Sequence, residues 1–135
     1  MKPPTRRKKI PPLESEPRAR LAAQAARDMK AEDIVILKVA ELVNYTDFFV
    51  IASGRSTKQA QAIAENVLKT IHQHHSRPLG VEGERDGNWI LIDWGAVIVH
   101  IFHHPVRAFY EIEKLYGEAC RMEWPGTKTG VDPQK

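Results

Sequence analysis

Two glutamates, Glu82 and Glu84, are spaced so that they could share a metal ion. Residues two apart on a strand point to the same side, and paired carboxylates can hold a divalent cation for nucleotidyl transfer. Ser56, just before a predicted helix, could then lie near a phosphate group. Gly83 and Arg85 are more typical of a strand end, however, and capping the helix is the simpler role for Ser56. A metal-dependent nucleotidyltransferase is therefore kept as the alternative function.

The histidines and the single cysteine form no recognisable catalytic pattern. His72, His74 and His75 cluster where a helix is predicted to end, and no pair has the i, i+4 spacing with a third ligand that zinc needs. Cys120 has no histidine nearby in the sequence. A phosphate-binding loop with lysine and a Gly-x-Ser-x-Gly elbow are both absent from the sequence. We therefore expect a protein that is not an enzyme and that uses no metal or cofactor.

The segment GNWILIDWGAVIVHIF places two tryptophans and an aspartate at the break between two apolar strands. Strand alternation puts Trp89, Leu91 and Asp93 on one side and the two intervening isoleucines on the other. Either Trp89 and Trp94 close off the protein's own core, or they anchor a partner. Tryptophan is enriched at interface hot spots, so an aromatic, an aliphatic and a carboxylate in a row predict a docking surface.

Hydrophobic periodicity predicts the elements that position these residues. Apolar residues at helical spacing follow Ser56 and Gln59, which form the start of a capping box. The predicted order is α-β-β-α-β-β-β-α, which implies an α/β fold with a mixed sheet of about five strands and packed helices. The predicted helices are residues 18–30, 56–72 and 105–117, and the predicted strands are residues 34–39, 48–52, 79–82, 89–92 and 97–102.

Charge and proline divide the 135-residue chain into three parts. Residues 1–17, rich in proline and basic residues, are expected to be a disordered head, residues 18–120 the folded domain, and residues 121–135 a flexible tail. The first 20 residues carry seven basic and two acidic side chains, so the other 115 carry 13 basic and 15 acidic ones. The basic stretch is either a solvated tail or an incidental contact for RNA phosphates.

The composition also bears on where the protein works. Hydrophobic residues make up 42% of the chain and charged ones 27%, which is typical of a globular domain. No apolar run approaches the roughly 20 residues that span a bilayer, and the first residues lack the apolar segment of a secretory signal. One cysteine allows no internal disulfide. We expect a cytoplasmic protein, with an organelle matrix as the alternative.

Several blocks in order resemble the ribosomal silencing factors, the RsfS or Iojap family. These blocks are KAEDIVILKV, TDFFVIASG followed by a helix, PLGVEGE, WILIDWG, VIVHIF and RAFYEIEKLY, and together they cover about residues 20 to 117. The resemblance implies an α/β fold similar to that of nucleotidyltransferases, used by proteins that are not known as enzymes. Some members of the family form homodimers.

The resemblance also implies a partner and a site. Family members bind the large ribosomal subunit through its ribosomal protein fourteen, which sterically blocks joining of the small subunit and represses translation when nutrients are short. The family commonly has Gly-Asp after the aromatic residue, whereas Ala96 follows the glycine here, so Asp93 is left to carry that charge. The residues that match the family's partner-binding segments are Glu82, Gly83, Trp89, Leu91, Asp93, Trp94 and Gly95.

Overall fold

A six-stranded mixed sheet forms the centre of the computed structural model, which describes residues 14–126. The strands lie in the order β3-β4-β5-β2-β1-β6, so the predicted mixed α/β fold is confirmed and the sheet has one strand more than expected. The strands are β1 (Glu32–Lys38), β2 (Phe48–Gly54), β3 (Gly80–Glu82), β4 (Trp89–Asp93), β5 (Val97–His103) and β6 (Cys120–Arg121), and the helices are α1 (Ser15–Asp28), α2 (Thr57–Gln73), α3 (His104–Tyr110) and α4 (Ile112–Leu115).

Only β2 and β5 pair in parallel, and the other neighbouring strands pair antiparallel. A parallel pair needs a long crossover, which α2 begins. Ser56 caps this helix as predicted, because its hydroxyl accepts a hydrogen bond from the backbone N–H of Gln59 at 3.0 Å. The Gln59 side chain in turn accepts one from the N–H of Arg55 at 2.7 Å. These two bonds hold the start of α2 at the end of β2.

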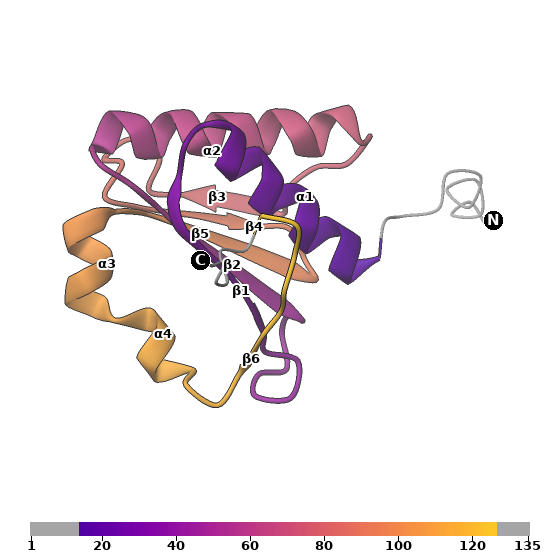
Figure 1. Cartoon of the computed structure of the whole chain (residues 1–135). Coiled ribbons are helices and arrows are strands. Elements are labelled where there is room, and N and C mark those ends of the chain that lie inside the picture. The colour runs from indigo at the N-terminus through magenta and orange to yellow at the C-terminus, as the bar shows by residue number, and fades with distance from the viewer. Residues whose placement is uncertain (1–13, 127–135) are drawn as a thin grey trace.

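Helices α1 and α2 cover one face of the sheet, which we call the inner face (Figure 1). Five buried alanines of α1 allow this helix to lie close to α2 and the strands. Helix α2 contributes the apolar stripe that the sequence predicts, with Ile63, Val67 and Ile71 buried. These side chains meet Ile90 and Ile92 of β4, so alternate residues of that strand are tied to the main core.

The opposite, outer face of the sheet is covered only in part, by α3 and α4 (Figure 1). The single helix predicted over residues 105–117 is wrong, because the chain breaks at Glu111, whose φ is +48°. The break redirects the second half of the segment. Ile112 is buried, but Ala108 and Leu115, which a continuous helix would place on the same side as Ile112, are exposed.

Both ends of the folded part lie outside the expected boundaries. Helix α1 begins at Ser15 and not at residue 18, and it includes Pro17, which is tolerated in a first turn because its missing N–H has no partner there. The C-terminal boundary also differs, because the folded part continues beyond residue 121, where the tail was expected to begin. Trp124 is only 7% exposed and packs into the main core, and β6 pairs with β1. The head and tail expected outside residues 14–126 lie beyond the described residues.

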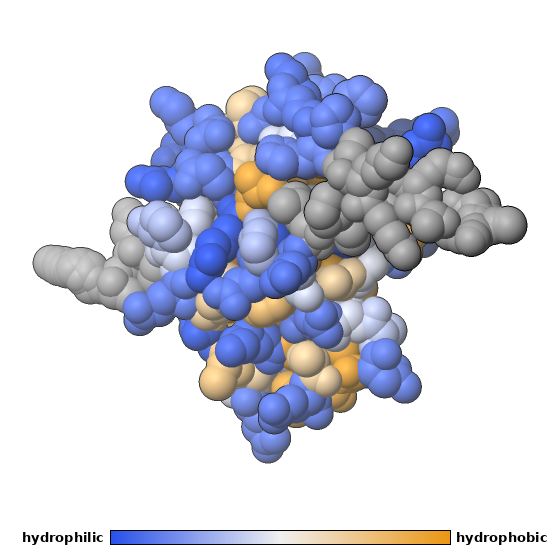
Figure 2. All heavy atoms as spheres, turned by 90° about the vertical axis from the view of Figure 1, so that its right-hand side faces the viewer, coloured by the Kyte–Doolittle hydropathy of each residue, from blue (hydrophilic) through white to orange (hydrophobic). Residues whose placement is uncertain are grey.

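Figure 2 shows a surface on which hydrophilic atoms predominate at the top, where α2 lies in Figure 1. Hydrophobic atoms reach the surface mainly in the lower part of that view. None of the helices within residues 14–126 has the length and apolar character needed to cross a bilayer. The polar side of α2 thus faces water, as its amphipathic pattern predicts.

Candidate functional site

The outer face of β4 carries the predicted docking residues. Trp89, Leu91 and Asp93 are half-buried and alternate with the fully buried Ile90 and Ile92, as strand alternation predicts. The antiparallel register places Glu82 of β3 directly opposite Leu91. Paired residues on neighbouring strands point to the same side of a sheet. An exposed carboxylate therefore joins the three β4 side chains, and we call this set of four residues the β4 strip.

Trp89 lies between the sheet and α3. Its ring centroid is 4.8 Å from that of Phe102 on β5 and 5.0 Å from that of Tyr110 on α3. Its indole Nε1–H donates a hydrogen bond of 3.2 Å to Nδ1 of His100. The indole is thus held on three sides but remains partly exposed, so part of its apolar surface is available to a partner.

Trp94 belongs to the interior, so the prediction that both indoles face a partner is wrong for this residue. Its side chain is 2% exposed and packs in the core on the inner face. Its Nε1–H donates to Oγ of Ser76 at 2.8 Å, and the guanidinium of Arg18 lies 4.9 Å from the ring centroid. Position 94 shares its parity with Ile90 and Ile92, so strand alternation continued by one step would have indicated this side.

The turn after β4 is held by hydrogen bonds that involve the predicted site residues. Oδ1 of Asp93 accepts from the N–H of Gly95 at 3.0 Å, so one carboxylate oxygen stabilises the turn before any partner arrives. Gly95 has φ +75°, a conformation that favours glycine. Its carbonyl accepts from the hydroxyl of Thr46 at 2.9 Å. Trp94 and Gly95 therefore fix the backbone turn at the end of the β4 strip.

Gly83 is required by the backbone at the end of β3. Its φ is +83°, and a β-carbon at this position would collide with the carbonyl oxygen of Trp89. A larger residue would push β3 away from β4. Gly83 thus keeps Glu82 next to Leu91 and contributes no side chain of its own.

His100 is a buried polar residue beneath the β4 strip, and its contacts were not anticipated from the sequence. It lies on β5 opposite Leu91, and its ring meets Phe49 edge-on at 4.8 Å between centroids. Burial lowers the pKa of His100 from 6.5 to about 4, so the imidazole is neutral near pH 7. Within residues 14–126 its Nε2 has no hydrogen-bond partner, which costs about 1–3 kcal/mol for a buried donor.

Three exposed apolar residues on α3 and α4 extend the surface beside Trp89. Phe109 is 79% exposed, Tyr110 50% and Leu115 74%. Phe109 and Tyr110 contact each other edge-on, and Tyr110 contacts Trp89. The sequence interpretation missed this patch because a continuous helix would have turned Leu115 inward. No local signal at Glu111 indicated the break.

The residues of the alternative metal-dependent function are not brought together as a metal site. Ser56 is engaged as the helix cap, and Glu84 lies in the loop after β3, where its carbonyl accepts a hydrogen bond from Gln61 at 2.8 Å. Glu82 faces outward on the β4 strip. Residues 14–126 contain no group of three or more histidine, cysteine, aspartate or glutamate side chains placed to hold a metal ion.

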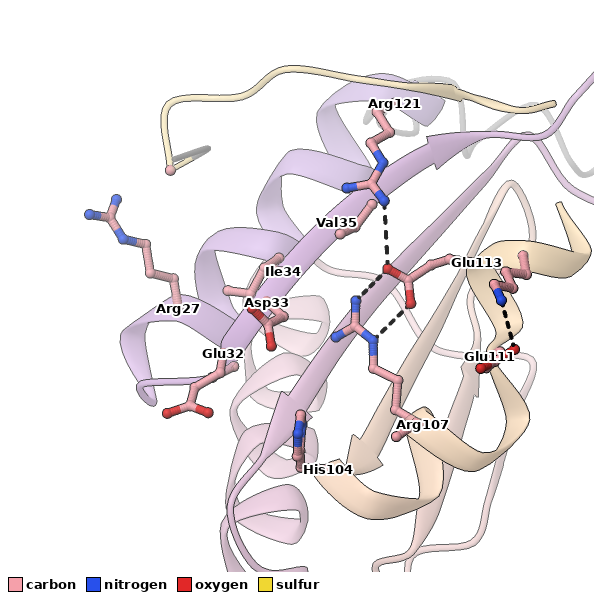
Figure 3. Close-up of a pocket in the computed structure, with 14 residues that line it drawn as sticks. Arg27, Glu32, Asp33, Ile34, Val35, His104, Arg107, Glu111, Glu113 and Arg121 are labelled. Atoms are coloured by element: carbon pink, nitrogen blue, oxygen red, sulfur yellow. Dashed lines mark hydrogen bonds and ion pairs between the residues drawn. The ribbon is translucent and has the colours of Figure 1, made fainter. Parts of the chain in front are cut away.

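A hollow of about 960 Å³ lies between β1 and the α3–α4 segment, away from the β4 strip (Figure 3). The buried guanidinium of Arg107 donates to both carboxylate oxygens of Glu113, at 3.0 and 2.9 Å, and to Oγ of Ser53 at 2.8 Å. The hydrogen bond from Arg107 lowers the pKa of Glu113, aided by the charge of Arg107 and Arg121. This network ties α3 and α4 to β2 and uses three of the five N–H donors of Arg107.

Comparison with known proteins shows which family this chain resembles. The family model described as "Ribosomal silencing factor during starvation" matches residues 12–135. A ribosomal silencing factor RsfS from Halalkalibacterium halodurans is 42% identical over 106 residues, covering 78% of this chain and 91% of the relative. The chloroplastic protein Iojap of Arabidopsis thaliana is 36% identical over 103 residues, covering 76% of this chain and 43% of the relative.

Solved structures agree. A crystal structure of a Chromobacterium violaceum protein superimposes with a TM-score of 0.76 at 30% identity, covering 85% of this chain and 95% of that one. A Bacillus halodurans structure gives a TM-score of 0.69 at 39% identity, covering 77% and 94%. The fold and the sequence relatives lead to one conclusion: this chain belongs to the ribosomal silencing factor family.

Proposed function

We propose that this protein binds the large ribosomal subunit through its ribosomal protein fourteen, using the β4 strip, and so blocks joining of the small subunit. It acts by occupying a surface and not by catalysis, and it represses translation when nutrients are limiting. A mouse relative, 34% identical over 94 residues, carries the name "Mitochondrial assembly of ribosomal large subunit protein 1", which supports a large-subunit partner.

The partly exposed Trp89 carries the proposal. A large aromatic side chain already fixed by its neighbours loses little conformational freedom on docking, so it is well suited to be an interface hot spot. Leu91 lies two residues further along the same strand and face. Together they offer a rigid apolar surface that helices α1 and α2 do not cover.

Charge indicates the chemistry of the partner surface. Glu82 is exposed and Asp93 half-buried on the same strip, and no basic residue belongs to it. Residues 21–135 carry 13 basic and 15 acidic side chains. Such a surface favours a basic partner and faster association with it. The basic residues 1–20 add nonspecific attraction to ribosomal RNA as a second, weaker contact.

Replacing Trp89 by alanine is expected to weaken binding to the large subunit tenfold or more, which corresponds to about 1.4 kcal/mol. Sedimentation of purified large subunits with increasing protein measures the dissociation constant. Wild-type protein is expected to travel with free large subunits and not with joined ribosomes. If Trp89→Ala binds as well as wild type, the assigned face is wrong.

Trp89 also contributes to packing, so each variant is checked for folding by far-UV circular dichroism at the assay temperature. Leu91→Ala is the second variant, because it removes apolar area from the same face without disturbing the indole. It is expected to weaken binding severalfold. Normal binding by a folded Leu91→Ala protein would contradict the proposal even if Trp89→Ala failed to fold.

Reversing the charge of Glu82 tests the proposed electrostatic attraction between the β4 strip and a basic partner. Glu82→Lys is expected to weaken binding about five- to tenfold at low salt, and less at high salt, because ions screen exposed charges. Glu65→Lys is the matched control, since Glu65 is exposed on α2 at the other face of the sheet and the net charge changes equally. Equal effects of the two substitutions would show that only net charge matters.

A further inference from the structure

His100 stands out on the outer face because it is polar where its neighbours are apolar. Phe49, Ile98 and Phe102 pack around the same part of the sheet, and all three are buried. The His100 side chain is 5% exposed and fills the space between Phe49 and Trp89. An apolar ring would fill this space equally well, so packing alone does not explain a histidine.

The hydrogen bond from Trp89 determines which form of the imidazole is present. An indole N–H can only donate, so Nδ1 of His100 must carry the accepting lone pair at the 3.2 Å contact. The ring proton then lies on Nε2. That nitrogen is buried and has no acceptor among residues 14–126. The structure therefore keeps a buried N–H unsatisfied while it supplies one acceptor to Trp89.

The contact with His100 restricts the orientation of the Trp89 indole. Phe102 and Tyr110 contact the ring without a hydrogen bond, so the bond from Nε1–H to Nδ1 of His100 adds the directional restraint. A fixed ring loses less freedom when a partner docks than one that rotates between positions.

We infer that His100 is a positioning residue, which orients the Trp89 indole for docking by accepting its Nε1–H on a tautomer-locked Nδ1. This inference rests on the proposed function for the docking step, whereas the orientation itself is a property of the free protein. His100 remains buried and touches no partner. The buried Nε2–H is the consequence of keeping an acceptor at this place in an apolar face.

Two substitutions at His100 distinguish the effect of its hydrogen-bond acceptor from the effect of its ring. His100→Asn places an amide oxygen near the position of Nδ1 and retains an acceptor, whereas His100→Phe retains a ring and removes the acceptor. Hydrogen exchange of the indole N–H, followed by ¹⁵N NMR of the full chain, reports the bond directly. Trp89→Phe assigns the Trp89 signal among the three tryptophans. Exchange is expected to speed up tenfold or more in His100→Phe and to stay within about threefold of wild type in His100→Asn.

Binding to purified large subunits then tests the positioning role. His100→Phe is expected to weaken binding about fivefold, and His100→Asn to restore it to within about twofold of wild type. In a Trp89→Phe background, which has no indole N–H, His100→Phe is expected to have no further effect. A structural role for His100 would instead weaken binding equally in both backgrounds, because independent effects multiply.

Indole hydrogen exchange and binding to large subunits test different claims, so either claim can be contradicted without the other. Unchanged indole exchange in His100→Phe would overturn the positioning role whatever the ribosome does. If wild-type protein does not bind large subunits while exchange responds as expected, the proposed function fails and the orientation of Trp89 by His100 stands. Should His100→Phe not fold, Trp89→Phe alone removes the same hydrogen bond, and normal binding by that variant would overturn the inference.

Discussion

Replacing Trp94 by alanine is expected to lower the free energy of unfolding by about 3–5 kcal/mol, the range for a large aromatic side chain lost from a core. The indole is 2% exposed, and its removal leaves a cavity among the residues of the main core. The substitution also leaves the hydroxyl of Ser76 without its donor and removes the ring beneath Arg18. Urea unfolding at pH 7, followed by far-UV circular dichroism, measures the change.

The same substitution at Trp89 is the matched control. Trp89 is partly exposed, so its loss is expected to cost less than that of the buried Trp94, about 2 kcal/mol. The two tryptophans are thus expected to have different roles: loss of Trp94 mainly lowers stability, and loss of Trp89 mainly weakens binding. Similar losses of stability for both variants, or a loss below about 1 kcal/mol for Trp94→Ala, would contradict this division.

Lowering the pH from 6.5 to 4 is expected to reduce the free energy of unfolding by about 3 kcal/mol through His100 alone. The folded-state pKa of about 4 lies below the ordinary value of 6.5 because burial disfavours the charged imidazole. Between these two values the unfolded chain binds the proton and the folded chain does not. The stabilisation is therefore full above pH 6.5 and is lost as the pH falls towards 4.

His100→Asn isolates this effect, because it cannot be protonated and the other five histidines are common to both proteins. The difference in unfolding free energy between wild type and His100→Asn is expected to change by about 3 kcal/mol between pH 7 and pH 4. Glu113 contributes stability that is full well above its ordinary pKa of 4.5 and is lost as the pH falls below it, because Arg107 lowers its pKa in the folded state, and this loss is common to both proteins. A constant difference across the range would show that His100 is not buried as described.

Much of the fold follows from local pattern. The apolar stripe and the Ser56 cap were enough to predict α2 nearly to the residue, because both act within a few residues along the chain. Alternation likewise placed Trp89 and Leu91 on one side of β4 and the isoleucines on the other. The resemblance of ordered sequence blocks identified the family, and the comparisons confirm it.

What the sequence by itself determined is therefore the set of elements, the division of β4 into two faces, and the family. Alternation indicates the side of Trp94, but only the tertiary structure decided that this side chain is enclosed, because Ser76 and Arg18 contact it on the inner face from distant parts of the chain. Tertiary contacts also accompany the break at Glu111, on either side of which Arg107 and Glu113 are joined by hydrogen bonds, with Arg107 also bonded to Ser53 of β2. Such contacts join residues up to 76 positions apart, and periodicity within one element carries no information about them.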